Sequence, residues 1–155
     1  MPILYIMVGV PGSGKTTFAK KLATARDAIH ISSDAIRKAL TGDENNQTAN
    51  KLVFPMMHTG IRVALKNGHN VIADATNITE RNRYMLVMQA AGTMARVVFV
   101  VMDTPFSECL ERNWNRDRVV PDYAMKRMID EYTIPTANEG GLVVFANNYV
   151  TDDIP

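Results

Sequence analysis

The sequence predicts an α/β fold in which an open, mostly parallel five-stranded sheet is covered by helices on both faces. Two observations lead to this prediction. Short apolar runs alternate with longer helical stretches along the 155 residues, as they do where right-handed crossovers join parallel strands. Each of the first four runs also ends in glycine-rich or polar residues. We therefore expect one three-layer domain over residues 1–155. Its site should lie at the carboxyl edge of the sheet, because ligands of such sheets bind beyond the carboxyl ends of the strands.

Five apolar segments are the expected strands. They cover residues 3–8, 28–32, 70–74, 96–102 and 142–146. Apolar runs of this length, bounded by turn signals, are typical of strands that lie buried in a parallel sheet. Both faces of the sheet therefore need cover from helices.

Helical stretches separate these strands, and the expected helices cover residues 17–25, 35–40, 48–67, 79–91, 104–116 and 122–132. Thr79 is the expected N-cap of one helix, and Thr104 with Pro105 gives another a capping residue and a first-turn proline. Pro55 is expected to kink or divide the helix over residues 48–67, because proline removes a main-chain donor. Gly68 is the expected end of that helix.

The segment GVPGSGKT, residues 9–16, fills every fixed position of the phosphate-binding pattern GxxxxGK[ST]. The strand before it and the helix after it favour nucleotide binding over a plain glycine turn with an exposed lysine. Its glycines allow several N–H groups to converge on one anion, Lys15 adds an ammonium, and the Thr16 hydroxyl can ligate Mg²⁺. We therefore expect a P-loop NTPase-type fold that binds ATP and Mg²⁺. The residues expected at the nucleotide are Gly12, Ser13, Gly14, Lys15, Thr16 and Thr17.

Composition and charge restrict the class of protein. Hydrophobic residues make up 46% of the chain, and no apolar run reaches the length of a membrane span. The single cysteine, Cys109, cannot form an internal disulfide, so we expect a soluble, cytoplasmic protein. A net charge of +1 argues against a broad basic surface for duplex DNA, so any nucleic-acid site must be local. His30, His58 and His69 show no metal-ligand spacing and are expected to be structural or exposed.

Asp34 and Arg37 follow the second predicted strand, one helical turn apart on one face. Asp34 can accept the proton of an acceptor hydroxyl, and Arg37 can hold an anionic group of that acceptor. The alternative is that Asp34 only caps its helix and forms a surface pair with Arg37.

The third predicted strand ends in Asp74, which is followed by Thr76 and Asn77. A carboxylate at this place can reach the Mg²⁺ shell, and the two short polar side chains can face nucleotide or acceptor. Residues of these types also form ordinary turns. Asp74 and Thr16 are the expected metal ligands.

Arg112 and Arg116 lie four residues apart at the end of the helix that follows the fourth strand, with Arg118 just beyond. If this segment folds over the phosphate loop as a helical lid, both arginines can neutralise charge on a triphosphate. The alternative is a basic helix end that complements the helix dipole, with Arg112 paired to Glu108.

The chain resembles the kinase domain of polynucleotide 5′-hydroxyl kinases of bacteriophage and bacterial nucleic-acid repair. The resemblance runs from the first strand to about residue 147 and rests on GVPGSGKT at 9–16, ISSDAIR at 31–37, DENNQ at 43–47, DATN at 74–77 and RNWNR at 112–116, with VPD at 120–122 matching more loosely. It implies that Asp34 is the general base and that Arg37 binds the acceptor's terminal phosphate. It also implies that Arg112 and Arg116 contact the donor phosphates. One departure is Ala75, which stands where phage members have a carboxylate.

The expected function is transfer of the γ-phosphoryl group of ATP to the 5′-hydroxyl end of DNA or RNA. Lys15, Asp34, Arg37 and Arg116 are the expected catalytic residues. One alternative is a P-loop kinase that phosphorylates a small-molecule hydroxyl, such as a nucleoside, sugar or nucleotide sugar. Another is a nucleotide-dependent regulatory protein without catalysis, although the pairing of Asp34 with Arg37 favours a kinase. A GTPase is disfavoured because no Asn-Lys-x-Asp motif is present.

Overall fold

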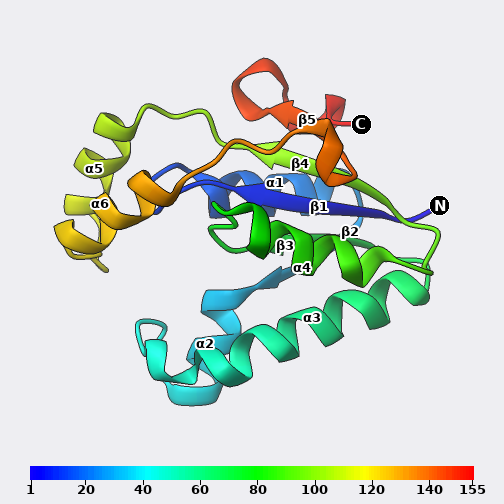
Figure 1. Cartoon of the computed structure of the whole chain (residues 1–155), viewed down its shortest axis with the longest axis horizontal. Coiled ribbons are helices and arrows are strands. Elements are labelled where there is room, and N and C mark those ends of the chain that lie inside the picture. The colour runs from blue at the N-terminus through cyan, green and yellow to red at the C-terminus, as the bar shows by residue number, and fades with distance from the viewer.

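A single parallel sheet forms the centre of the computed structural model, which describes residues 1–155 (Figure 1). Its strands are β1 (Ile3–Val8), β2 (Ala28–Ser32), β3 (Asn70–Asp74), β4 (Arg96–Val101) and β5 (Leu142–Phe145). They lie in the order β2-β3-β1-β4-β5, and all four pairings are parallel. The predicted five-stranded sheet is confirmed, and it is parallel throughout rather than mostly parallel.

The six predicted helices are all present. They are α1 (Lys15–Ala25), α2 (Ser33–Thr41), α3 (Asn50–Lys66), α4 (Glu80–Ala90), α5 (Phe106–Trp114) and α6 (Asp122–Glu131). None of them has both the length and the apolar composition that crossing a lipid bilayer requires.

Two expectations about helix ends and breaks differ from the structure. Pro55 lies inside α3, which continues through it and is not divided there. It stands early in the helix and removes one main-chain bond, and the buried side chains of Met57 and Ile61 hold the helix against the core. Thr104 does not cap α5, whose N-cap position is held by Pro105 without a side-chain bond. The Thr104 hydroxyl instead donates to the Ser13 carbonyl at 2.9 Å, which ties the start of α5 to the phosphate loop.

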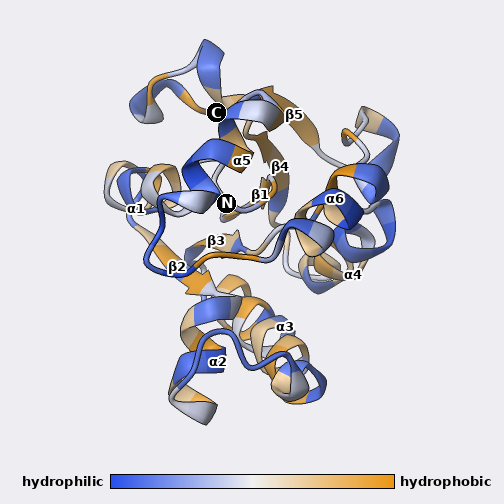
Figure 2. Ribbon diagram, turned by 90° about the vertical axis from the view of Figure 1, so that its left-hand side faces the viewer, coloured by the Kyte–Doolittle hydropathy of each residue, from blue (hydrophilic) through white to orange (hydrophobic).

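Alternating side chains of the central strand supply a core on each face of the sheet. Leu4, Ile6 and Val8 join the larger cluster of buried residues, which packs against α3 and α4. Tyr5 and Met7 join the smaller cluster, which packs against α1. Figure 2 shows the largely apolar strands between helices of mixed hydropathy. The three predicted layers are therefore helix, sheet and helices.

The strand order places the functional edge of the sheet. The chain leaves β1 toward the β2 side and later crosses to β4 on the other side of β1, so the loop after β1 lies where the strand order reverses. Ligands of parallel sheets bind at such a point, beyond the carboxyl ends of the strands. In Figure 1, β1 runs from the N-terminus toward α5 and α6, which stand at that end of the sheet.

A buried arginine fastens the segment after α6 to this framework. Arg83 of α4 is fully buried and pairs with Glu139 through Nε–Oε1 and Nη2–Oε2 distances of 2.7 and 3.2 Å. Its Nη1 donates to the carbonyls of Asn77 and Thr133 at 3.0 and 2.8 Å, and its Nη2 donates to the Thr133 hydroxyl at 3.0 Å. The guanidinium thereby joins the segment over residues 133–139 to α4 and to the end of β3.

Candidate active site

The phosphate loop has the curled form that its glycines predict. Gly12 and Gly14 adopt φ angles of +84° and +88°, which side-chain-bearing residues rarely adopt. A Cβ atom at Gly12 would also lie 2.4 Å from the main-chain oxygen of Cys109 in α5. Gly12 is thus required both by its backbone angle and by the close approach of α5.

A cavity of about 1180 Å³ opens beside this loop at the carboxyl edge of the sheet. Nearly all the residues that the sequence predicts for the site line it: Gly12, Gly14, Lys15, Thr16, Thr17, Asp34, Arg37, Asp74, Arg112 and Arg116. Ser13 is the exception. It is 2% exposed, and its N–H donates to the Val10 carbonyl at 3.2 Å, so the loop itself uses this donor.

Lys15 lies among charges of both signs in this cavity. Burial lowers the pKa of its ammonium, the carboxylates of Asp74 and Asp34 raise it, and the net result is a pKa below the usual value. Arg116 and Arg118 add to the lowering because they are of like charge. A bound anion would relieve both effects, since it replaces lost hydration and balances the positive charges.

We expect Lys15→Ala to weaken ATP binding by about 10- to 100-fold, since a hydrogen bond from a charged group contributes about 1.5–3 kcal/mol. Phosphoryl transfer should fall as well, because the ammonium also balances charge that moves during transfer. Titration calorimetry with ATP and steady-state turnover measure the two effects. The matched control is Lys20→Ala, which removes an exposed lysine of the same helix. Unchanged ATP affinity in Lys15→Ala would contradict the assignment.

The predicted metal ligands lie side by side. The Thr16 hydroxyl donates to Asp74 Oδ2 at 3.1 Å, and Asp74 itself is 4% exposed. Burial raises the pKa of Asp74, but the His30 hydrogen bond and the Lys15 charge outweigh it and lower the pKa overall. A hydroxyl and an ionised carboxylate are oxygen donors that suit Mg²⁺. The protein has no group of three or more His, Cys, Asp or Glu placed to hold a metal, so an ion here would depend on phosphate and water oxygens as well.

His30 contacts a predicted metal ligand, and the sequence does not predict this contact. Its Nε2 lies 2.8 Å from Asp74 Oδ2, the same oxygen that accepts from Thr16. The expectation that His30 is only structural or exposed is therefore incomplete. The contact arises because β2 pairs with β3 in a register that puts Ser32 opposite Asp74, and this strand order cannot be read from spacing along the chain.

Asp34 and Arg37 form the predicted pair, but Arg37 has little left to offer a ligand. Arg37 is 4% exposed, and its Nη1 donates to Asp34 Oδ1 at 2.8 Å and to the Glu44 carbonyl at 3.3 Å. Its Nε and Nη2 both donate to Asn50 Oδ1, at 3.2 and 2.8 Å. The guanidinium thus holds Asp34 in position and keeps one Nη2 hydrogen without a protein acceptor. The contact of Arg37 with an acceptor phosphate, which the resemblance implies, stays a prediction.

Three arginines from α5 and the segment after it face the cavity, as a lid would require. Arg112 is half exposed, pairs with Glu108 and lies beside Gly14 of the phosphate loop. Arg116 is partly buried and makes no side-chain hydrogen bond or ion pair, which leaves its donors open. Arg118 donates from Nη2 to Asp34 Oδ2 at 2.9 Å.

A buried asparagine shapes the segment that carries two of these arginines. Asn113 is fully buried, and its Nδ2 donates to the Val120 carbonyl at 2.8 Å while its Oδ1 accepts from the Val120 N–H at 3.0 Å. The two bonds close the loop between α5 and α6. The backbone around Arg116 and Arg118 is therefore held at both ends.

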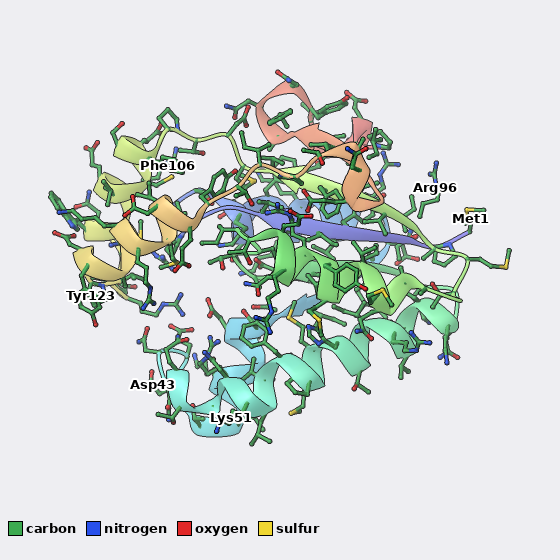
Figure 3. All side chains as sticks on the ribbon, in the orientation of Figure 1. Met1, Asp43, Lys51, Arg96, Phe106 and Tyr123 are labelled. Carbon is green, nitrogen blue, oxygen red and sulfur yellow. The ribbon has the colours of Figure 1, made fainter.

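Part of the cavity lining is apolar and aromatic. Its side chains come from α3, α4, the α5–α6 loop and α6, and include Phe54, Met57, Met85, Leu86, Val119, Val120, Tyr123 and Met128. Polar side chains there are Asn45, Gln47, His58, Asn82 and Arg127. Figure 3 shows Tyr123 on α6 and Asp43, which follows α2, on the same side of the molecule. Such a mixture suits a flat ring system that carries polar substituents.

Asn77 lines the cavity together with Thr76, but its side-chain amide is engaged with the main chain. It is 4% exposed, with a φ of +48°, and its Nδ2 donates to the carbonyls of Met7 and Ala75 at 2.8 and 3.3 Å. Its amide holds the ends of β1 and β3 together. A contact of Thr76 or Asn77 with nucleotide or acceptor stays a prediction.

Comparison with protein families and with curated proteins gives kinase relatives. A family model described as an AAA domain matches residues 4–135. The chain is 28% identical over 138 residues to L-seryl-tRNA(Sec) kinase of Methanococcus maripaludis, which covers 86% of this chain and 53% of that protein. It is also 28% identical over 132 residues to a candidate bifunctional polynucleotide kinase/RNA ligase of Autographa californica nuclear polyhedrosis virus, which covers 76% of this chain and 19% of that protein.

Among solved structures, the chain is similar to a protein of the Pnkp1/Rnl/Hen1 RNA repair complex. The identity is 27% and the TM-score is 0.69, over 84% of this chain and 43% of that one. The chain spans only part of the length of each of these relatives. The polynucleotide kinase and RNA repair names among them confirm the resemblance that the motifs predict.

Proposed function

The chain belongs to the AAA-domain family matched over residues 4–135, its relatives include P-loop kinases, and on this premise we propose that it phosphorylates the 5′-hydroxyl end of DNA or RNA with ATP. One observation carries the proposal. Lys15 of the phosphate loop and Asp34 line the same cavity, close enough for their charges to influence each other. A donor phosphate and an acceptor hydroxyl could therefore meet between them.

The proposed reaction uses these side chains in defined roles. The acceptor oxygen forms a bond to the γ-phosphorus while the bond from that phosphorus to the β–γ bridging oxygen breaks, and ADP leaves. Asp34 takes the proton of the attacking hydroxyl, and Lys15 and Arg116 balance the charge on the transferring group. Mg²⁺ held at Thr16 and Asp74 would neutralise charge on the phosphate oxygens.

A nucleic-acid end is the acceptor that the apolar and aromatic part of the cavity lining suits best. Phe54 and Tyr123 offer aromatic surface to a base, and Asn45 and Gln47 offer hydrogen-bonding groups. The site is local, in keeping with a net charge of only +1. The viral and RNA-repair relatives support the same acceptor class.

The test is incubation of the protein with γ-labelled ATP, Mg²⁺ and matched 5′-hydroxyl DNA and RNA oligonucleotides. Oligonucleotides that already carry a 5′-phosphate are the blocked controls. We expect label only on the 5′-hydroxyl oligomers, and the amounts on DNA and RNA give the preference. Absence of label on every oligomer, with ATP binding intact, would refute a polynucleotide acceptor.

A different hydroxyl acceptor is the second candidate function. The relative that covers 86% of this chain is named for phosphorylating seryl-tRNA, and a small-molecule hydroxyl uses the same chemistry. Seryl-tRNA and a set of nucleosides and sugars should be included as acceptors in the labelling experiment. Competition by short 5′-hydroxyl oligonucleotides separates the two candidates, because only an acceptor that shares their site is displaced.

A further inference from the structure

His30 holds the carboxylate of Asp74 from the neighbouring strand. β2 and β3 run in parallel, with His30 opposite Ile72 and Ser32 opposite Asp74. Alternate residues of a strand lie on the same face of the sheet, so His30, Ile72 and Asp74 share one face. On that face, His30 Nε2 lies 2.8 Å from Asp74 Oδ2. A carboxylate offers only acceptors, so Nε2 carries a hydrogen and donates it.

The two oxygens of Asp74 have different surroundings. Oδ2 accepts from His30 and also from the Thr16 hydroxyl, which lies at 3.1 Å. Oδ1 makes no hydrogen bond with the protein, and it is not among the enclosed side-chain atoms that lack a partner. Because Asp74 lines the cavity, Oδ1 is the oxygen that a ligand in the cavity can reach.

His30 differs from the other partner of Oδ2 in its relation to the cavity. Thr16 lines the cavity and is itself a predicted metal ligand, whereas His30 does not line it. The His30 side chain is 20% exposed and makes no other hydrogen bond. Any effect of His30 on a ligand must therefore pass through Asp74.

The imidazole supplies a direction that the hydroxyl does not. The last torsion of an aspartate side chain is broad, and a hydroxyl hydrogen rotates to suit its acceptor. The N–H of His30 lies in the plane of a ring, and the ring stands on a strand that pairs with β3 from Ala28 to Ser32. The bond from His30 therefore determines which oxygen of Asp74 stays free on the cavity side.

We propose that His30 is a positioning residue of the predicted magnesium site. Its Nε2–H holds Oδ2 of Asp74 and thereby leaves Oδ1 for the ion or for one of its water ligands. This inference rests on the proposed function, in which Mg²⁺ is held at Thr16 and Asp74. The role needs a hydrogen on Nε2 and no positive charge on the ring. Carboxylates that hold metal ions depend on outer hydrogen bonds of this kind.

The experiment measures metal binding apart from phosphoryl transfer. The variants are His30→Leu, which removes the donor, and His30→Gln, whose side-chain amide keeps an N–H at a similar reach. His69→Leu is the matched control, because His69 is exposed and its side chain makes no hydrogen bond. Electron paramagnetic resonance gives the affinity of Mn²⁺ for each protein saturated with a non-hydrolysable ATP analogue. Titration calorimetry in EDTA gives the affinity for the analogue without metal, and thermal unfolding shows whether each variant is folded.

In His30→Leu, we expect the Mn²⁺ affinity to fall by about 10- to 100-fold, as it does when an outer hydrogen bond of a metal ligand is lost. The metal-free affinity for the analogue should stay unchanged. His30→Gln should keep most of the Mn²⁺ affinity, and His69→Leu should keep all of it. Equal Mn²⁺ affinity in His30→Leu and the unchanged protein would overturn the inference. So would equal losses in His30→Leu and His30→Gln, or a loss of metal-free affinity as large as the loss of Mn²⁺ affinity.

A measurement on the unchanged protein does not depend on the folding of any variant. The ¹⁵N chemical shifts of the His30 ring, assigned from the signals that His30→Gln lacks, show which nitrogen carries hydrogen. Hydrogen on Nε2, with and without the analogue and Mg²⁺, is the expected result, and Nε2 without hydrogen would overturn the inference. Absence of nucleotide-dependent Mn²⁺ binding in the unchanged protein would overturn the proposed donor site as well. Label transfer to 5′-hydroxyl oligonucleotides tests the proposed acceptor independently of His30.

Discussion

Replacement of Asp34 by alanine is expected to lower turnover by about 10² to 10⁴, the usual contribution of a positioned general base, while ATP binds as before. The carboxylate lines the cavity that the phosphate loop opens into, and two arginines fix its orientation. Its side chain is bonded to Arg37 and Arg118 and makes no hydrogen bond to the phosphate loop, so we expect its removal to leave the nucleotide contacts in place. Single-turnover phosphoryl transfer and ATP affinity, measured on the same preparation, separate the two effects.

The matched control is Asp43→Ala. Asp43 is an exposed aspartate that follows α2, and its contacts are confined to its own loop. This variant should retain full turnover. Near-normal turnover of Asp34→Ala would mean that another group takes the proton, and a large loss of ATP affinity would mean that Asp34 organises the donor site instead.

Replacement of Arg83 by methionine is expected to reduce the free energy of unfolding by about 3–5 kcal/mol, as removal of one partner of a buried ion pair does. The guanidinium makes five hydrogen bonds, to Glu139, Asn77 and Thr133. Methionine fills most of the volume but leaves these acceptors without a donor. Urea denaturation followed by circular dichroism measures the change. Arg81→Met, at an exposed position of the same helix, is the control and should stay within about 0.5 kcal/mol.

The dependence of this effect on pH gives a separate check. Burial raises the pKa of the Glu139 carboxyl, but the hydrogen bonds from Arg83 and from the Thr136 N–H outweigh it, so the pKa lies below its usual value. A carboxyl with a lowered pKa stabilises the fold above its unfolded pKa, about 4.3, and loses that contribution as the pH falls through its folded pKa. The stability difference between the unchanged protein and Arg83→Met should therefore shrink in acid. A difference below about 1 kcal/mol at neutral pH would show that water or local rearrangement replaces the guanidinium.

Local patterns were enough to predict the elements and most of the site. The strand, glycine-rich loop and helix around Lys15 are contiguous in sequence, as are Asp34 and Arg37, so spacing alone relates their side chains. Arg112 of α5 and Arg116 beyond it could be predicted only as a conditional lid, because their position depends on how that helix packs.

Contacts between distant segments could not be predicted in the same way. His30 reaches Asp74 only because β2 pairs with β3. Arg118 reaches Asp34 only because the α5–α6 loop lies over the start of α2. Arg83 stands in α4 as one of several polar residues, and its burial follows from the course of the chain after α6.

The contact between the phosphate loop and α5 determines when the segment that carries Arg112 and Arg116 becomes ordered. Gly12 meets the Cys109 carbonyl with no room for a side chain, and Thr104 donates to the carbonyl of Ser13. The helix that carries Arg112 and leads to Arg116 is thereby fixed on the phosphate loop. The entropy of ordering the backbone that carries these arginines is lost when the chain folds. In the proposed reaction, this segment would therefore already lie at the donor site before nucleotide binds.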